Sequence, residues 1–403
     1  MINAKRYQKD DILLMVISFY SFFTITQRLY PISINRILTS FIIVMLCIRK
    51  TYRKDKLYVI FALVFLGLYT ITISINKSQN INDFIYFFVA ILMLIEFRDD
   101  KAIQGLENAY SKRKSVIDKI TFINLGIIVV ELMMPICYSN QWGEKYFCGL
   151  TNTAHTMASS VCLNMAFMLL CLMKKRFRLS YLAILCVYLV AIFSTGARIF
   201  LIPGVIIIFY YISNKIKNEK VKYLLYGVSI LLLVTIFLGT GMYNKFVYAA
   251  TDPYGNTTSF LESFTSGRSV FWLVDLEDYT QSNLIQQLFG HGFDYIYRLN
   301  LAKVRMEIWA HNDFINLLVC VGLSGLLLYI YALRKLFVFL KRSLCSNNYH
   351  LIMCYMLIPA FWNGFYTYAH YMFSFYVLLI AMENNDNKII KNYNQLEMHV
   401  WTN

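Results

Sequence analysis

The ninth apolar segment of the chain, residues 223–242, reads YLLYGVSILLLVTIFLGTGM and contains no charged residue. An α-helix that crosses a membrane needs roughly 17–25 such residues. Basic residues precede this segment between Lys215 and Lys222, and a long polar segment, Tyr243 to Asp313, follows it. The stretch therefore predicts a membrane-spanning helix with a basic turn on one side and a polar loop on the other.

The same pattern recurs along the chain, which has 403 residues, 58% of them hydrophobic, and a mean hydropathy of +0.51. This composition exceeds the apolar share of an ordinary soluble domain. We therefore expect an all-α, polytopic membrane protein with about twelve transmembrane helices. The expected spans are Ile12–Thr26, Ile32–Ile48, Leu57–Ile75, Ile81–Phe97, Ile120–Tyr138, Thr151–Met173, Leu179–Phe193, Ile199–Ile212, Tyr223–Met242, Phe314–Leu333, Tyr349–Phe365 and Tyr368–Met382.

The formal charge of +15 comes mainly from the turns between these spans. Of the 38 Lys and Arg residues, 28 lie at the termini and in every second turn. The positive-inside rule then puts both termini in the cytoplasm and the polar segment outside. Outside the turns, no basic face with interleaved aromatic residues is present, so nucleic acid is not an expected partner.

This topology divides the chain into four parts. Residues 1–242 hold the first nine helices, and residues 243–313 form one large extracytoplasmic loop that we expect to be catalytic. Residues 314–382 hold the last three helices, and residues 383–403 are the expected cytoplasmic tail.

The long loop contains signals for local structure. Ser266-Gly267 is typical of a polar cap before a helix that begins at Arg268, and Asn283–Phe289 predicts a second short helix that Gly290 ends. A loop of this length without structure of its own is uncommon. We therefore expect it to pack on the membrane surface and to carry function.

Three residues near the expected outer face are candidates for chemistry, and each has two interpretations. Arg198, in the tight turn Ser194–Arg198, either anchors at the membrane interface or binds an anion as a bidentate donor. Arg268 is either a solvated loop charge or part of a phosphate site at a helix N-terminus. His311, before the tenth span, is either structural or the proton acceptor best suited to neutral pH.

Weaker candidates surround these three. Glu131 falls within the fifth span, where a carboxylate either has a function or bonds to a neighbouring helix. His155 and Asn152 could line a cavity, and Cys137 could pair with Cys148.

Other polar groups favour plainer roles. His291 lies between two glycines and is expected to shape a turn. His and carboxylate residues do not recur at ligand spacing, so we expect no metal site and no cofactor. Four loop carboxylates are expected to be solvated: Glu262, Asp275, Asp294 and Glu307.

These motifs together resemble the O-antigen ligase and polymerase superfamily. The turn Ser194–Arg198 resembles its outer-turn arginine motif, and Ser266-Gly267-Arg268 followed by Trp272 resembles its loop arginine motif. Gly290-His291-Gly292-Phe293, then His311-Asn312-Asp313, resembles its histidine motif. Two departures exist: Arg198 follows an alanine, and Asp313 stands where members have a small residue.

The resemblance implies a GT-C-like membrane glycosyltransferase of the bacterial cytoplasmic membrane. Its donor and acceptor would be oligosaccharides linked to undecaprenyl pyrophosphate, and transfer would invert the sugar without a metal. Arg198 and Arg268 would hold the pyrophosphate, and His311 would accept the proton of the acceptor hydroxyl. A chain-length regulator and a flippase are partners that the family implies.

Three functions and a non-catalytic membrane scaffold stay open at this point, and the scaffold predicts that Arg198, Arg268 and His311 do not converge in space. The first is a Wzy-type polymerase that joins repeat units into capsular, O-antigen or exopolysaccharide chains. The second is a ligase that transfers finished polysaccharide to the lipid A core, with the same fold and chemistry. The third, from another class, is a transporter such as a flippase of lipid-linked oligosaccharides, which would not need His311 beside two arginines.

Overall fold

The computed structural model describes most of the chain. The described residues are 2–32, 34–52, 56–75, 81–97, 99–141, 144–240, 243, 262, 265 and 267–401. Within them the predicted all-α class is confirmed, apart from one small hairpin of strands β1 (Tyr138–Gln141) and β2 (Glu144–Phe147). Ser266 and most of residues 244–264 lie outside the described part.

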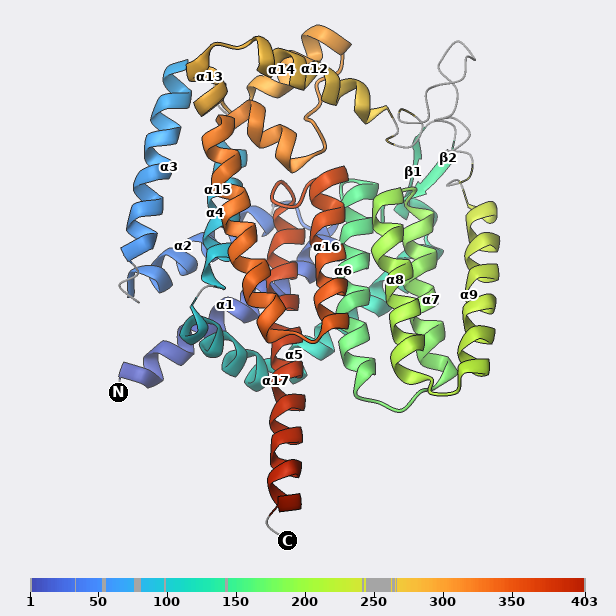
Figure 1. The fold of residues 1–403 in the computed structure, drawn as a ribbon. Helices are drawn as coiled ribbons and strands as arrows, with labels where there is room; N and C mark the ends of the chain where they lie inside the picture. The colour runs from blue at the N-terminus through green and yellow to red at the C-terminus, as the bar shows by residue number, and fades with distance from the viewer. Residues whose placement is uncertain are drawn as a thin grey trace.

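The α-helices of the described part are shown in Figure 1. The α-helices are α1 (Ile2–Ile25), α2 (Ile34–Tyr52), α3 (Lys56–Ile75), α4 (Ile81–Glu96), α5 (Asp100–Met133), α6 (Ala154–Met173), α7 (Leu179–Ser194), α8 (Arg198–Lys215), α9 (Glu219–Gly239), α12 (Arg268–Gln281), α13 (Leu284–Phe289), α14 (Tyr295–Val304), α15 (Asp313–Ser343), α16 (Ser346–Trp362) and α17 (Ala369–Trp401).

Four helices in the described part are long and apolar enough to cross a membrane: α6, α8, α9 and α15. Two shorter apolar helices, Ile60–Ile75 and Leu179–Ser194, accompany them. A helix also occupies each of the other expected spans. The structure thus supports a membrane protein, and the full set of twelve spans stays a prediction.

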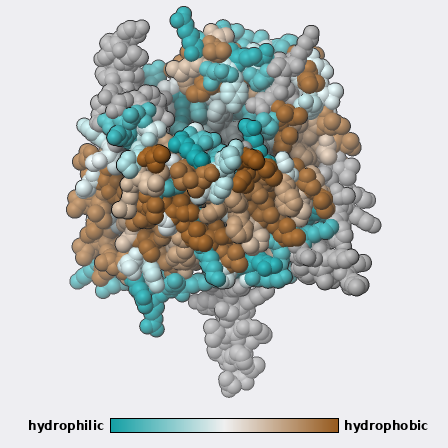
Figure 2. Space-filling model, turned by 180° about the vertical axis from the view of Figure 1, so that it is seen from behind, coloured by the Kyte–Doolittle hydropathy of each residue, from teal (hydrophilic) through white to brown (hydrophobic). Residues whose placement is uncertain are grey.

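The surface has the layering that a bilayer requires. Figure 2 shows a broad hydrophobic belt with hydrophilic surface above and below it. Helix α9 lies at the edge of the bundle, and its Leu224, Leu231 and Leu238 side chains are exposed (Figure 1). Exposed apolar area of this extent is unusual on a soluble monomer and suits contact with lipid.

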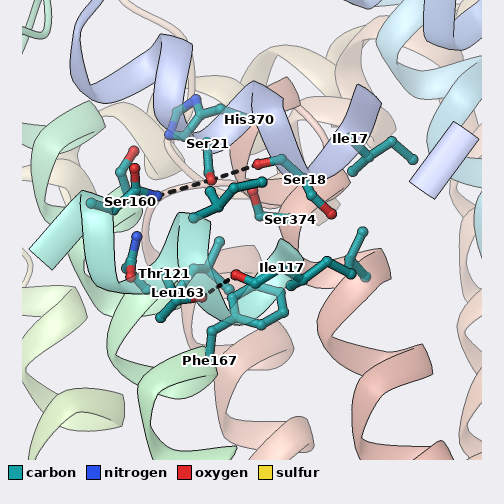
Figure 3. A pocket seen from close by; sticks show the side chains of 14 residues that line it. Ile17, Ser18, Ser21, Ile117, Thr121, Ser160, Leu163, Phe167, His370 and Ser374 are labelled. Atoms are coloured by element: carbon teal, nitrogen blue, oxygen red, sulfur yellow. Dashed lines mark hydrogen bonds between the residues drawn. The ribbon is translucent and has the colours of Figure 1, made fainter. Parts of the chain in front are cut away.

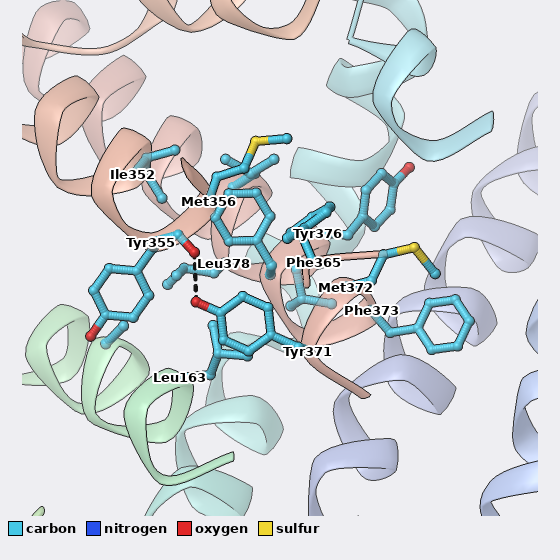
Figure 4. Close-up of a cluster of buried hydrophobic side chains, with 14 of the residues drawn as sticks. Leu163, Ile352, Tyr355, Met356, Phe365, Tyr371, Met372, Phe373, Tyr376 and Leu378 are labelled. Atoms are coloured by element: carbon cyan, nitrogen blue, oxygen red, sulfur yellow. Dashed lines mark hydrogen bonds between the residues drawn. The ribbon is translucent and has the colours of Figure 1, made fainter. Parts of the chain in front are cut away.

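The first half of α17 passes through the centre of the body, where α1, α5 and α6 surround it. Its residues from Tyr371 to Met382 are buried. The Tyr371 hydroxyl donates to the Tyr355 carbonyl oxygen of α16 at 2.6 Å, and Figure 4 shows these two side chains among Phe365, Met356 and other apolar groups. Tyrosine can occupy this core because its hydroxyl finds a partner there.

Several expected boundaries are wrong. Helix α5 begins at Asp100, so the basic residues that we expected in a turn continue the helix, and the Asp99 side chain caps it by accepting from Ala102 N at 3.2 Å. The same helix ends at Met133 instead of reaching Tyr138, because a residue before proline, here Met134, disfavours helical backbone.

Two C-terminal boundaries are also wrong. Helix α15 continues to Ser343, and α17 continues through the expected tail to Trp401. Lys and Arg are good helix formers, so the end of an apolar run does not end a helix.

One expected basic turn holds a buried ion pair. Arg49 of α2 is 4% exposed, and its Nε lies 2.5 Å from Asp10 of α1. Its guanidinium also pairs with Glu96 of α4 and donates to the Ala102 carbonyl oxygen. This arginine fastens four helices at the end of the body that carries both termini (Figure 1).

The opposite end carries a layer of three short helices, α12 to α14 (Figure 1). The predicted helix from Arg268 is α12, and the predicted short helix is α13. A capping box at Asn283 caps the N-terminus of α13. Helix α14 was not predicted. Residues 267–312 therefore contain three helices, and their place outside the membrane stays a prediction.

Candidate functional site

Arg198 begins α8 directly after a tight turn. Gly196 has φ +68°, and a Cβ at that position would overlap the Tyr146 ring, which packs against the turn from β2. Thr195 Oγ1 accepts from Ala197 N at 3.2 Å, and Thr195, Gly196 and Ala197 are buried. The turn thus holds the half-buried Arg198 at the end of the bundle that faces the α12–α14 layer.

Arg268 begins α12 after Gly267, which has φ +80°. Its guanidinium donates to the carbonyl oxygen of Trp362, the last residue of α16. Four residues later in α12, Trp272 Nε1 donates to the Ala310 carbonyl oxygen at 2.6 Å. Helix α12 therefore binds both the end of α16 and the segment that carries His311.

His311 lies between Trp309 and the cap of α15. Its backbone has φ +51°, a left-handed conformation that is uncommon for residues other than glycine. The Trp309 and His311 rings lie 4.7 Å apart, and Asn312 Oδ1 accepts from Phe314 N at 2.9 Å and Ile315 N at 3.1 Å.

The structure brings the three sequence candidates together. Arg268 lies within electrostatic range of both Arg198 and His311, and His155 of α6 also acts on His311. Burial, and then the positive charge of Arg268, lower the pKa of His311 well below 6.5, while contacts with Asn363 oppose the change. The imidazole is therefore neutral at pH 7 and able to take a proton.

Arg268 keeps its charge in this setting. Burial lowers its pKa to about 10, and Tyr368 acts in the opposite direction. At neutral pH the site therefore contains two guanidinium groups beside an uncharged base. Such a set can bind an anion and stabilise negative charge that develops on it.

A buried carboxylate, Asp313 at the start of α15, supports the site. Asp313 Oδ2 accepts from Phe365 N at 2.7 Å, from Tyr366 N at 3.3 Å and from the Tyr329 hydroxyl at 3.1 Å. These bonds hold the connection between α16 and α17, which begins at Asn363, directly after Trp362. Asp313 thus ties this connection to α15.

The Gly290–Gly292 turn packs on a break in α15. Gly322 has φ +68° and ψ −170°, so α15 is not the continuous helix that we expected. The break lets the Val319 and Cys320 carbonyl oxygens accept from His291 N at 3.0 Å and from Gly292 N at 2.8 Å. Only glycine fits at 290 and 322, because a Cβ at either position would overlap the backbone of the other segment.

His291 has the structural role that the sequence predicts. Its Nε2 lies 2.8 Å from Ser282 Oγ, and its ring stacks on Tyr295 at 4.0 Å. The Tyr295 hydroxyl donates to Asp278 at 2.9 Å. These contacts join α12, the glycine turn and α14.

One of the four loop carboxylates contradicts its prediction. Asp275 is fully buried between α12 and α14, opposite Asn300, and is not solvated. Burial raises its pKa to about 7. Glu307 is exposed, as expected, and Asp294 lies 3.5 Å from Arg298.

The remaining weaker candidates lie around the site. Glu131 is buried beneath the turn at Gly149 and Leu150, at the outer end of α5. Cys137 and Cys148 are neighbours but free thiols, and Cys148 Sγ lies 2.8 Å from Ser139 Oγ.

A polar cavity lies deeper in the body, between α1, α5, α6 and α17 (Figure 3). Ser18, Ser21, Asn124 and Ser160 line it, and His370 closes one side with Nε2 2.6 Å from Ser159 Oγ. Its walls contain no acidic, lysine or arginine side chain. His370 also borders a second, open pocket at the outer end of the bundle, which Asn152 lines as the sequence suggested.

Sequence reasoning missed Asn363 and Tyr368 as parts of the site. Asn363 and Tyr368 lie in the connection between α16 and α17, which runs from 363 to 368. We expected this connection to contain only residues 366 and 367. The Asn-Gly pair at 363–364 was the available signal for a turn there.

Among the described residues, no group of three His, Cys, Asp or Glu side chains is placed to hold a metal ion. No protein-family model matches the chain, and no curated protein matches it.

Proposed function

We propose that this chain is a membrane glycosyltransferase that polymerises oligosaccharide repeat units linked to undecaprenyl pyrophosphate. It works at the outer face of the bacterial cytoplasmic membrane, with twelve spans and both termini in the cytoplasm. The observation that carries the proposal is the convergence of Arg198, Arg268 and a neutral His311 at one end of an apolar helical body.

In this reaction the two arginines bind the pyrophosphate of the donor. His311 takes the proton of the acceptor hydroxyl while its oxygen bonds to the anomeric carbon of the donor sugar. The bond between that carbon and the pyrophosphate oxygen breaks, and its electron pair leaves with undecaprenyl pyrophosphate. Attack opposite the leaving group inverts the sugar, and the arginines stabilise the charge that develops.

The arrangement explains why the base is neutral. Burial and the positive charge of Arg268 both disfavour a protonated histidine, and together they keep the imidazole of His311 in its basic form. General-base catalysis contributes about 10²–10⁴-fold to a rate. Loss of the imidazole should therefore reduce turnover by at least about 100-fold while the fold persists.

The test uses the purified protein in lipid nanodiscs, supplied with the lipid-linked repeat unit. We expect a ladder of longer products from the wild type and no ladder from His311→Ala. His350→Ala is the matched control, because His350 is exposed at the start of α16, away from the site. A ladder that persists in His311→Ala would disprove the role of this residue.

The same preparation separates the alternative functions. Transfer that requires an added lipid A core acceptor would identify a ligase. Movement of the lipid-linked unit across the bilayer without a new glycosidic bond would identify a transporter.

A further inference from the structure

A second pocket opens beside the site, at the outer ends of α1, α2, α6 and α17. Asn35, Arg36 and Thr39 of α2, Asn152, Thr367 and Tyr368 are among its lining residues. We call it the outer pocket. It encloses about 690 Å³ of empty space, part of it open to solvent.

Two polar atoms in this lining are buried and make no hydrogen bond to any described residue: Asn35 Oδ1 and Thr367 Oγ1. A buried polar group without a partner costs stability, and native structures rarely retain one without a reason. Because both atoms belong to residues that line the same pocket, a ligand with several hydroxyl groups would satisfy them together.

The chemistry of the remaining lining favours a saccharide. It combines amide and hydroxyl groups with the aromatic rings of Tyr20, Tyr86 and Tyr368, and contains no carboxylate. Aromatic faces cover the apolar faces of a sugar ring, and amides bind its hydroxyls. Arg36 is exposed and lies within electrostatic range of Tyr86, so it adds a cation to the pocket.

Tyr368 connects this pocket to the site. Its ring lies 6.2 Å from the Trp309 ring, and it interacts electrostatically with Arg268. Trp309 in turn lies 4.7 Å from His311. Tyr368 therefore connects the lining of the outer pocket, through the Trp309 ring, to the imidazole of His311.

We propose that the outer pocket is the acceptor subsite, where the terminal sugars of the acceptor bind with one hydroxyl directed toward His311. The donor pyrophosphate then occupies the arginine pair on the other side of that histidine. This inference rests on the proposed function, and it assigns Asn35 and Thr367 as the residues that recognise the acceptor.

The test measures binding of two probes to the protein in nanodiscs. One probe is the free oligosaccharide released from the lipid-linked repeat unit by mild acid, and the other is undecaprenyl pyrophosphate without sugar. We expect Asn35→Ala and Thr367→Val each to weaken oligosaccharide binding about tenfold, which corresponds to the loss of a satisfied polar contact. Undecaprenyl pyrophosphate should bind these variants as it binds the wild type, and bind Arg268→Ala more weakly.

Asn214→Ala and Thr70→Val are the matched controls, since both residues are exposed on other parts of the bundle. Oligosaccharide binding that is absent from the wild type, or equal in all variants, would overturn the subsite. Loss of undecaprenyl pyrophosphate binding in Asn35→Ala would also overturn it, because the carrier would then occupy the pocket. Polymerisation by the wild type tests the proposed function separately. A ladder of products would support that function even if the subsite is wrong, and the absence of a ladder would contradict it.

Discussion

Asp313 Oδ2 accepts a hydrogen bond from the backbone amide of Phe365 at 2.7 Å, across 52 residues of sequence. This contact ties the start of α15 to the connection between α16 and α17. His311 lies two residues before Asp313, and Asn363, which contacts His311, lies two residues before Phe365. The Asp313 carboxylate therefore helps to hold His311 and Asn363 next to each other.

Substitution of Asp313 should therefore affect both the fold and the reaction. Asp313→Ala leaves three buried donors without their acceptor, and each such loss costs about 1–3 kcal/mol. Asp313→Asn retains one oxygen and should lose less. Thermal unfolding and polymerisation by the two variants check this order. Asp294→Asn is the control, and equal stability of Asp313→Ala and wild type would contradict the role.

The pH dependence of turnover should report the low pKa of His311. Since burial and Arg268 lower this pKa well below 6.5, the imidazole stays unprotonated as pH falls through 6.5, and kcat/KM should stay level there. His155→Gln removes a side chain that lowers the pKa of His311, so this pKa should rise and the acid limb should move to higher pH. His350→Gln should leave the profile unchanged. An acid limb at the same pH in His155→Gln would disprove the coupling.

The stability of the outer layer should depend on pH through Asp275. Its pKa is about 7 in the folded protein and about 4 in an unfolded chain, so the folded state binds the proton more tightly between these values. Stability is therefore highest below pH 4 for this group, falls as pH rises from about 4 to 7, and is lowest above pH 7.

Asp275→Asn removes the cost of holding an ionised carboxylate in a buried position. It should raise the unfolding temperature at pH 8 and change it little at pH 4, with a gain of up to about 4 kcal/mol, since one pKa unit is about 1.4 kcal/mol. Glu307→Gln, at an exposed carboxylate, is the control. A gain for Asp275→Asn that is the same at both pH values would contradict the assignment.

The contact between the glycine turn and the break in α15 should tolerate no side chain. Gly290→Ala and Gly322→Ala each force a Cβ into the facing backbone and should cost about 2 kcal/mol or more. Gly227→Ala in α9 meets no atom within 4 Å and removes a poor helix former, so it should be neutral or stabilising. Thermal unfolding of the three variants makes the comparison, and a neutral Gly322→Ala would show that the break can relax.

The sequence by itself determined the parts of this protein that depend on neighbouring residues. Apolar runs predicted where the helices of the body lie, and the capping residues Asn283 and Gly290 marked the two ends of α13. The types of Arg198, Arg268 and His311 also indicated their chemistry, because formal charge, bidentate geometry and the ordinary pKa of a group belong to the side chain itself.

Only the tertiary structure decided what these residues meet. The carbonyl partner of Arg268 is 94 residues away, and the support of Asp313 comes from 52 residues away. Burial of Asp275 and the break at Gly322 likewise depend on segments that pack from elsewhere in the chain. Local patterns contain no information on such contacts, since they arise when helices distant in sequence pack together, and that packing also sets the pKa of His311.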